Sequence, residues 1–511
     1  MSFGRTRSVT LEGLSGTVVD VEAHLSGGLP AFMLGGLPDT ACAQSPNRVR
    51  AAAASIGHSL APHRITVNLS PASIHKNGTG FDLPIAIAVA TALNLVPADR
   101  VRDLVHLGEL ALDGAIRSVH GVLPAVLSAV RAGCQDVVVP VDNAAEARLV
   151  PGIRVHPVAH LADLIAAYAS GAESFGVAEP SPTMRPTLVK AQLDLADVVG
   201  QEEARFALEL AASGGHHLFL LGPPGSGKTM LAERLSTILP TLLRDQSIDV
   251  LAVRSLLGVT AAELSVEGVP PFVAPHHSAT QAAIIGGGSR SVKPGAISQA
   301  HHGVLFLDEA PEFKSSVLQS LRQPLESGRV VVSRARTTVR YPARFQLVMA
   351  ANPCPCGLGF GKGVGCSCTP LAKRGYLGRL SGPLLDRVDL QVQVPAVTRS
   401  SLAGVAGESS AVVAERVQRA RQAQADRWAG TPWDVNSQVP GSTLRRGRWR
   451  LPGAVTVDLD RALDRGHLTL RGYDRVARVG WTIADLAGRG TPTRDDLGQA
   501  LTLRNQDAVA A

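Results

Sequence analysis

The sequence is poor in cysteine and aromatic residues and has no long apolar run. Six cysteines in 511 residues are too few for a disulfide-stapled secreted scaffold, and aromatic residues make up only 4%. The longest apolar stretch, residues 84–96, is too short to span a bilayer and contains Asn94. No apolar run follows Arg5 and Arg7, as a secretory signal would require. We therefore expect a soluble cytoplasmic protein without membrane contact.

Charge is not concentrated either: the chain has no acidic or basic tail, and its net charge is +7. An excess of this size permits an anionic partner such as nucleic acid without requiring one. Strand-like and helix-like runs alternate over residues 1–170 and again over 191–396, residues 171–190 are rich in turn formers, and 397–511 is poor in strands. We therefore expect an α/β protein with two mixed domains, a linker at 171–190 and a helical C-terminal domain.

The most informative stretch is a complete phosphate-binding loop of the G-x-x-x-x-G-K-[ST] type. It consists of Gly222, Pro223, Pro224, Gly225, Ser226, Gly227, Lys228 and Thr229. An apolar strand-like run, 218–221, precedes the loop, and a helix-like run, 230–239, follows it, which is the context that the motif needs. Lys228 would bind the β- and γ-phosphates of ATP, and the Thr229 hydroxyl would bind Mg²⁺.

A second stretch, residues 304–309, is an apolar strand that ends in two carboxylates, Asp308 and Glu309. Asp308 can hold Mg²⁺ through water, and Glu309 can polarise an attacking water. Together the two motifs predict nucleotide hydrolysis and not binding alone.

Four of the cysteines form a C-x-C-x₉-C-x-C cluster: Cys354, Cys356, Cys366 and Cys368. Four thiolates at two paired spacings suit tetrahedral Zn²⁺. Free thiols or a redox-sensitive pair are the alternative. The histidine pairs 276–277 and 301–302 are more typical of packing or hydrogen bonding, and we assign them no metal.

Longer motifs carry a resemblance to a known family. The chain resembles the magnesium-chelatase-like branch of the AAA+ ATPases and, within it, the ComM (YifB) family, over nearly its full length. The matching segments are 66–69, 80–84, 197–201, 274–280, 286–288, 293–295, 300–309, 351–357 and 381–389. The resemblance implies a central P-loop parallel sheet with helices on both faces, and a C-terminal helical lid.

The family resemblance also implies a function. The implied protein is a hexameric ring motor that acts on DNA, specifically a branch-migration helicase in recombination during natural transformation. A magnesium-chelatase-type ATPase or protein remodeller is the alternative, against which stands the Lon-like N-terminal domain that we expect chelatase subunits to lack. An ATP-dependent protease is a third alternative, which we disfavour.

The family pattern assigns three further roles. Asn352 matches sensor 1, which positions water; its alternative is a turn-capping asparagine. Arg387 matches the arginine finger offered to a neighbouring subunit's nucleotide; its alternative is a surface ion pair with Asp386 or Asp389. Arg471 matches sensor 2 in the helical lid.

The N-terminal domain resembles the Lon-protease-like domain, an α+β fold of S5-like type. The positions that match the Lon nucleophile and lysine are Gly80 and Leu123, which cannot carry that chemistry. We therefore interpret the domain as a noncatalytic scaffold. Lys76 and Arg64 are candidate DNA contacts, with plain surface charge as the alternative.

Two other segments have open interpretations. In this branch, stretches such as residues 253–299 are insertions that face the ring's pore, so Lys293 and Arg290 could touch a threaded polymer; an ordinary surface loop is the alternative. Residues 414–450 contain eight arginines, three acids and three tryptophans. Such a composition suits nucleic-acid contact with base stacking, but we favour packing of the tryptophans in the lid core with solvated arginines.

Overall fold

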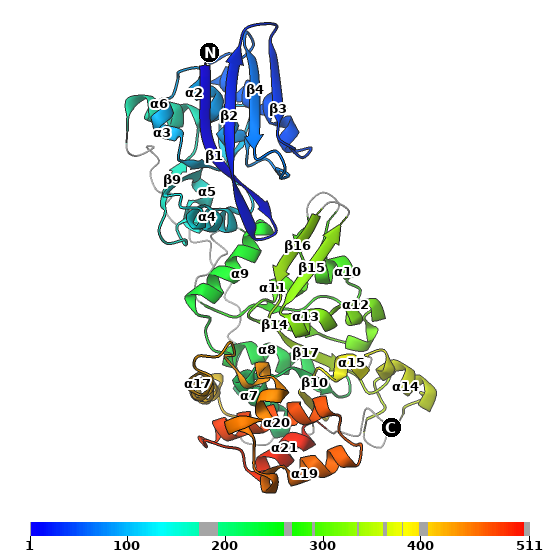
Figure 1. The fold of residues 1–511 in the computed structure, drawn as a ribbon. Helices are drawn as coiled ribbons and strands as arrows, with labels where there is room; N and C mark the ends of the chain where they lie inside the picture. The colour runs from blue at the N-terminus through cyan, green and yellow to red at the C-terminus, as the bar shows by residue number, and fades with distance from the viewer. Residues whose placement is uncertain are drawn as a thin grey trace.

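The computed structural model describes residues 2–172, 193–259, 268–288, 292–334, 337–360, 365–380, 382–397 and 407–504. Figure 1 shows three successive parts along the chain, with the N-terminal domain at one end and the C-terminal helices at the other. The predicted linker, residues 171–190, lies outside the described residues except for 171 and 172.

The N-terminal domain is built on a mixed seven-stranded sheet in the order β3-β4-β2-β1-β5-β8-β9. Its strands are β1 (Ser2–Glu12), β2 (Ser15–Ser26), β3 (Ala31–Gly35), β4 (Arg64–Ser70), β5 (Val105–His106), β8 (Asp136–Pro140) and β9 (Arg154–Val158), with a separate pair, β6 (Glu109–Leu110) and β7 (Ile116–Arg117). Its helices are α1 (Ser45–Ser55), α2 (Asp82–Ala92), α3 (Ala98–Val101), α4 (Val122–Arg131), α5 (Val141–Ala147) and α6 (Leu161–Ser170). Every residue of α2 is buried, because this helix is apolar all round and lies between the sheet and α1 and α6.

The central domain holds a five-stranded, wholly parallel sheet in the order β11-β14-β17-β10-β18. The strands are β11 (Phe272–Val273), β14 (Val304–Leu307), β17 (Gln346–Ala351), β10 (Leu218–Leu221) and β18 (Leu390–Gln393). The helices α7 (Glu202–Gly214) and α8 (Lys228–Ile238) pack on one face, where they share a core with Val304. Leu305 belongs to the core of the opposite face, with α12 (Ser315–Ser320) and α14 (Pro370–Gly378). The predicted P-loop sheet with helices on both faces is confirmed.

Further helices and strands connect the strands of this sheet. They are α9 (Arg244–Leu256), α10 (Gln281–Ile285), β12 (Gly286–Gly287), β13 (Lys293–Pro294), α11 (Ala296–Gln299), α13 (Arg322–Ser327), β15 (Arg329–Arg334), β16 (Thr337–Pro342) and α15 (Gly382–Leu385). Strands β15 and β16 form an antiparallel hairpin that points toward the N-terminal domain (Figure 1).

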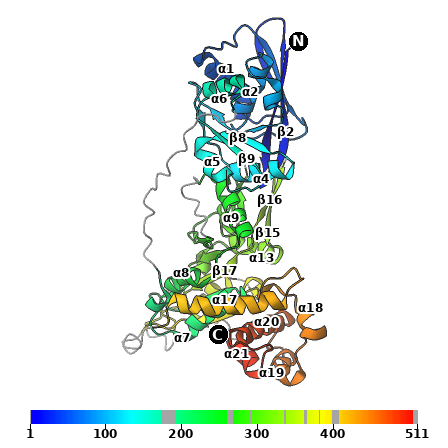
Figure 2. The same ribbon diagram turned by 90° about the vertical axis from the view of Figure 1, so that its left-hand side faces the viewer.

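The C-terminal part is helical, as expected for a lid. It contains α17 (Ser410–Arg427), α18 (Gly441–Leu444), α19 (Gly453–Asp464), α20 (Leu470–Leu486) and α21 (Arg494–Thr502). Figure 2 shows α17 lying across α7 and α8, and its Val413 and Val417 join the core of the central sheet. The lid is therefore packed directly on the helix that follows the phosphate loop.

The tryptophans of the lid form an aromatic core. Trp428 and Trp481 are buried, and Trp449 packs with ring centroids 4.9 Å from Trp428 and 5.9 Å from Trp481. The packing of the tryptophans in the lid core is thus confirmed. Some arginines differ from the expected solvated state: Arg421 donates to the Ala212 carbonyl at 2.6 Å, and Arg427 lies 4.5 Å over the Trp481 ring and pairs with the buried Asp485.

The N-terminal and central domains share a core. Leu251 and Ala252 of α9 are buried among N-terminal residues that include Leu123, and the Gly121 N–H donates to the Ser255 carbonyl at 3.0 Å. Figure 2 shows α9 directly below α4. Helix α9 therefore belongs by sequence to the central domain and by packing to both domains.

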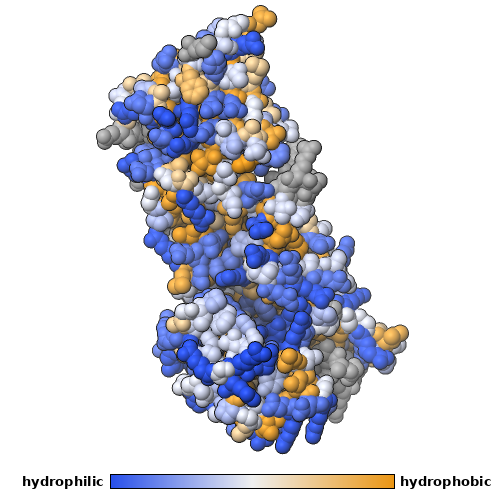
Figure 3. All heavy atoms as spheres, viewed as in Figure 1, coloured by the Kyte–Doolittle hydropathy of each residue, from blue (hydrophilic) through white to orange (hydrophobic). Residues whose placement is uncertain are grey.

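No helix among the described residues is long and apolar enough to cross a membrane. On the face drawn in Figure 3, hydrophilic side chains cover most of the surface and apolar ones are scattered among them.

Candidate nucleotide-binding site

The phosphate loop lies between β10 and α8, at the carboxyl end of the parallel sheet, where open α/β sheets bind ligands. A Cβ on Gly222 would lie 2.1 Å from the Val394 carbonyl oxygen, so only glycine fits this turn. Gly227 precedes α8 with φ 87°, and no side chain caps the helix. The first N–H groups of α8 are thus available to phosphate oxygens.

The Lys228 side chain folds back into the phosphate loop. Its ammonium donates to the carbonyl oxygens of Gly222 and Pro223, both at 2.8 Å, and to Asn352 Oδ1 at 3.2 Å. These three bonds use all three donors of the ammonium group. Burial lowers the pKa of Lys228, and the carboxylates of Asp308 and Glu309 oppose that shift. The ammonium is therefore held within the phosphate loop by carbonyl oxygens of the loop and by Asn352.

Thr229 and Asp308 meet across the site, although they are far apart in sequence. The Thr229 hydroxyl donates to Asp308 Oδ2 at 2.8 Å, and the other oxygen of Asp308 accepts from the Glu309 N–H at 2.9 Å. A hydroxyl and a carboxylate are hard oxygen donors, which suit Mg²⁺. The residues present therefore fit the metal that a phosphate loop uses.

Glu309 is placed differently from its neighbour. It has a left-handed backbone with φ 48°, which turns the chain directly after β14. Its side chain is 51% exposed, and Oε2 lies 3.4 Å from His277 Nδ1. A partly solvated carboxylate beside the Thr229–Asp308 pair is suited to polarise water.

Sequence reasoning missed two supporting residues. Gln201, with φ 58° before α7, donates from Nε2 to the Ser226 carbonyl at 2.6 Å and so holds the phosphate loop from one side. His277 contacts Glu309. Both residues lie in segments matched to the family, but those segments alone gave them no role.

The two predicted arginines lie apart from the cluster around Lys228. Arg387 is 8% exposed and forms an ion pair with Glu326. The alternative that we considered, a pair with Asp386 or Asp389, is wrong: Asp386 lies 3.7 Å from Arg471, and Asp389 is buried in a different ion pair. Because Arg387 is buried, its positive charge needs a nearby anion, and Glu326 on α13 supplies it. The finger and sensor roles of Arg387 and Arg471 stay predictions.

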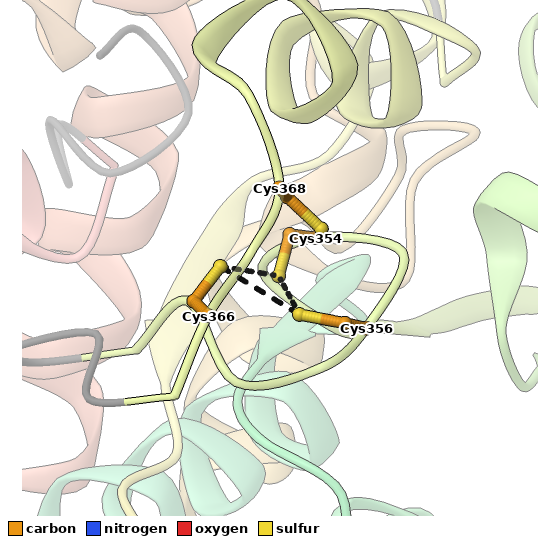
Figure 4. Close-up of side chains that lie close together, drawn as sticks. All are labelled: Cys354, Cys356, Cys366 and Cys368. Atoms are coloured by element: carbon orange, nitrogen blue, oxygen red, sulfur yellow. Dashed lines mark hydrogen bonds between the residues drawn. The ribbon is translucent and has the colours of Figure 1, made fainter.

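The four clustered cysteines converge in space, as Figure 4 shows. The Cys354 sulfur lies 3.4 Å from that of Cys356 and 3.7 Å from that of Cys366. The Cys356 and Cys366 sulfurs are 3.6 Å apart, and the sulfur of Cys368 completes a group within 4.8 Å. Four thiolates bound tetrahedrally at 2.3 Å would have sulfurs separated by about 3.8 Å. The geometry of this group fits zinc.

A second cluster contains Asp249, His301 and His302, with ligand atoms within 4.8 Å of one another. His301 Nδ1 accepts the Arg344 N–H at 3.1 Å, so the ring proton of the neutral imidazole is on Nε2. Neither ring nitrogen of His301 is then free for a metal. We still assign this histidine pair no metal.

Lys76 is not on the surface, so both interpretations of it are wrong. Its side chain has no exposed area, and its ammonium donates to the Pro71 carbonyl. The backbone of Lys76 pairs with Leu37 and Asp39, which draws the side chain into the domain. Burial lowers the pKa of Lys76.

The other candidate polymer contacts stay predictions. Arg64 and Lys293 are exposed, at the start of β4 and on β13 respectively. Arg290 lies outside the described residues.

Three family models match the chain in succession. They are described as subunit ChlI of Mg-chelatase (residues 21–143), magnesium chelatase, subunit ChlI (194–402), and magnesium chelatase, subunit ChlI C-terminal (407–504). The first matches most of the N-terminal domain. Contrary to our expectation, the presence of that domain therefore does not argue against the chelatase-type alternative.

Relatives match over almost the whole length. An uncharacterized protein of Mycobacterium tuberculosis (strain ATCC 25618 / H37Rv) is 48% identical over 99% of this chain and 100% of its own. Competence protein ComM of Haemophilus influenzae is 40% identical over 99% of this chain and 98% of its own. The uncharacterized protein YifB of Escherichia coli (strain K12) is 38% identical over 100% of this chain and 98% of its own.

Proposed function

The chain belongs to the ComM (YifB) family of magnesium-chelatase-like AAA+ ATPases, and we propose that it is an ATP-hydrolysing ring motor that acts on DNA. One observation carries the catalytic part of this proposal. Residues from three neighbouring strand ends meet at the phosphate loop, through the Lys228–Asn352 and Thr229–Asp308 hydrogen bonds. Such a constellation suits phosphoryl transfer to water.

Each residue of the site then has a defined task. The N–H groups at the start of α8 and the Lys228 ammonium bind and orient the phosphates. Thr229 and Asp308 hold Mg²⁺, which when bound neutralises charge on the phosphates. Glu309 accepts a proton from the attacking water, and Asn352 positions that water.

Arg387 would complete the site of the next subunit in a hexamer. In the single chain it pairs with Glu326, whose side chain is 58% exposed. Because Glu326 is exposed, water can solvate its carboxylate when the pair opens, so giving up the arginine costs Glu326 little. We propose that assembly moves Arg387 from Glu326 to the neighbouring subunit's nucleotide.

DNA as the substrate has weaker support. The net charge of +7 favours an anionic partner, and one full-length relative is named a competence protein. We propose a branch-migration helicase in recombination during natural transformation. The chelatase-type ATPase or protein remodeller remains a second candidate, because all three family models carry chelatase descriptions.

A comparison of activators distinguishes these candidates. ATP turnover of the purified full-length protein is measured alone and with branched DNA, single-stranded DNA, casein or a porphyrin. We expect branched DNA to stimulate turnover and to be converted to separated duplexes only when ATP is present. Stimulation by porphyrin alone would favour the chelatase-type function, and stimulation by casein alone would favour a protein remodeller.

We also propose that the cysteine cluster binds one zinc ion. The sulfur separations support tetrahedral ligation, and an expected cytoplasmic location would keep the thiols reduced. Metal analysis of protein prepared with reductant and without chelator should find about one zinc per chain, and Cys354→Ser should lose it. A wild-type preparation without metal would reject the site.

A further inference from the structure

The cysteine cluster lies directly against the phosphate loop. Gly357 has φ 77°, and a Cβ at this position would lie 2.5 Å from Cγ of the Pro224 ring. The Gly357 N–H donates to the Cys354 carbonyl at 2.9 Å, which closes a tight turn around the first cysteine pair. The backbone of the cysteine loop is therefore in van der Waals contact with the wall of the nucleotide site.

A second connection runs through the end of β17. Gly222, the first residue of the phosphate loop, donates its N–H to the Ala351 carbonyl at 3.1 Å. Asn352 follows and accepts from Lys228, and Cys354, which is fully buried, comes two residues later. The strand that leads into the cysteine loop thus contacts the first residue of the phosphate loop, and the cysteine loop itself contacts Pro224.

The tip of the phosphate loop has little other support. A Cβ on Gly225 would meet nothing within 4 Å. Gln201 holds one side of the tip through its bond to Ser226, and Gly357 closes the other side at Pro224. Since the loop must hold its N–H groups in a fixed arc to bind phosphate, movement of either support should change nucleotide affinity.

We propose that the turn at residues 354–357 acts as a positioning element for the phosphate loop, in which a metal held by the four thiolates keeps the Gly357 backbone against Pro224 and so sets the affinity for ATP. The proposal rests on the proposed ATP site and the proposed zinc site. It makes zinc a determinant of nucleotide binding and not only of local stability. None of the four cysteines touches the nucleotide in this scheme.

Gly357→Ala tests the contact, with Gly365→Ala as the matched control. Both glycines have a left-handed backbone, with φ 77° and 85°, so both variants carry similar backbone strain. A Cβ on Gly365 meets only Leu358, at 3.6 Å, an ordinary contact. Affinity is measured by titration with a fluorescent ATP analogue and zinc by metal analysis. We expect Gly357→Ala to bind the analogue about tenfold more weakly, and Gly365→Ala to stay within about twofold of wild type.

A Pro224→Ala background provides the second arm. Without the ring, a Cβ on Gly357 has room, so the loss caused by Gly357→Ala should shrink to about twofold relative to Pro224→Ala alone. Wild-type protein stripped of zinc should bind the analogue more weakly than loaded protein, and should recover when zinc is restored. If Gly357→Ala itself loses zinc, the comparison of stripped and loaded wild-type protein still tests whether the metal sets nucleotide affinity.

The outcomes separate the proposals. Equal affinities of the two alanine variants, or of stripped and loaded wild type, would overturn the positioning role. Wild-type protein that binds no nucleotide would refute the proposed ATPase instead. Wild-type protein that binds nucleotide but never carries zinc would refute the zinc site, and with it the metal's part in positioning.

Discussion

Replacing Arg387 separates a structural role from a catalytic one, because the first changes folding stability and the second changes the rate of hydrolysis. In the single chain the guanidinium pairs with Glu326, a residue on the surface. Because the Arg387 side chain is 10% exposed and that of Glu326 is 58% exposed, loss of the pair should cost about 1–3 kcal/mol of folding stability. An arginine finger is worth about 10³ or more in rate, which corresponds to about 4 kcal/mol of transition-state stabilisation. Arg387→Ala should therefore lower the melting temperature without unfolding the chain, leave ATP binding nearly intact and remove hydrolysis.

The matched control is Glu326→Gln, which removes the ion pair and keeps the arginine. If Arg387 acts in the neighbouring subunit, this variant should hydrolyse ATP at least as fast as wild type, because the guanidinium is released from its own subunit. If the pair only stabilises the fold, both variants should behave alike. The assay combines ATP turnover, titration with a fluorescent ATP analogue, and thermal unfolding.

Two results would refute the finger. One is normal turnover in Arg387→Ala, and the other is full-rate hydrolysis by dilute monomeric wild-type protein. Mixtures of Arg387→Ala and Lys228→Ala protein provide a further check, because some mixed interfaces combine an intact phosphate loop with an intact finger. Partial recovery of turnover is expected there.

Three other perturbations follow from the site and the core. Lys228→Ala should abolish ATP binding, whereas Glu309→Gln should retain binding and lose turnover; normal turnover of Glu309→Gln would contradict its role as a base. DNA binding should weaken steeply between about 50 and 200 mM salt, as counterion release requires, and casein should not be degraded under any of these conditions. Acid should destabilise the fold, because burial lowers the pKa of His106 to about 3 and of His301 to about 4, while the unfolded imidazoles titrate near 6.5. The unfolded state then binds more protons, so the melting temperature should fall as pH drops from about 6.5 to 4, and His106→Asn should flatten that dependence.

The core of the nucleotide site could be predicted because its signals are local. The phosphate loop is a contiguous motif, and its strand and helix context is readable on either side. Asp308 and Asn352 each end a strand-like apolar run, and the carboxyl ends of neighbouring parallel strands meet at one edge. Their convergence on Thr229 and Lys228 follows once these strands lie beside β10 in the sheet.

The partners of single side chains could not be predicted in this way. Arg387 pairs with Glu326, which is 61 positions away and carries no motif. Lys76 looked like surface charge because its neighbours in sequence are polar. Its burial depends on backbone pairing with residues 37–39, a long-range contact that no period or motif in the sequence records.

The N-terminal domain depends on helix α9 of the central domain to complete its core. Its Leu251 and Ala252 are nearly inaccessible to solvent within a core otherwise built from N-terminal residues, and Gly121 is bonded to Ser255. A fragment that ends before the central domain would lack α9 and would expose the apolar surface that α9 covers. Loss of this buried surface would lower the stability of the N-terminal core. Helix α8 begins at Lys228 of the phosphate loop, and a short segment connects it to α9. Helix α9 in turn completes the N-terminal core. Any role of the N-terminal domain in the motor is therefore best measured in the full chain, where movement of α8 can reach it through α9.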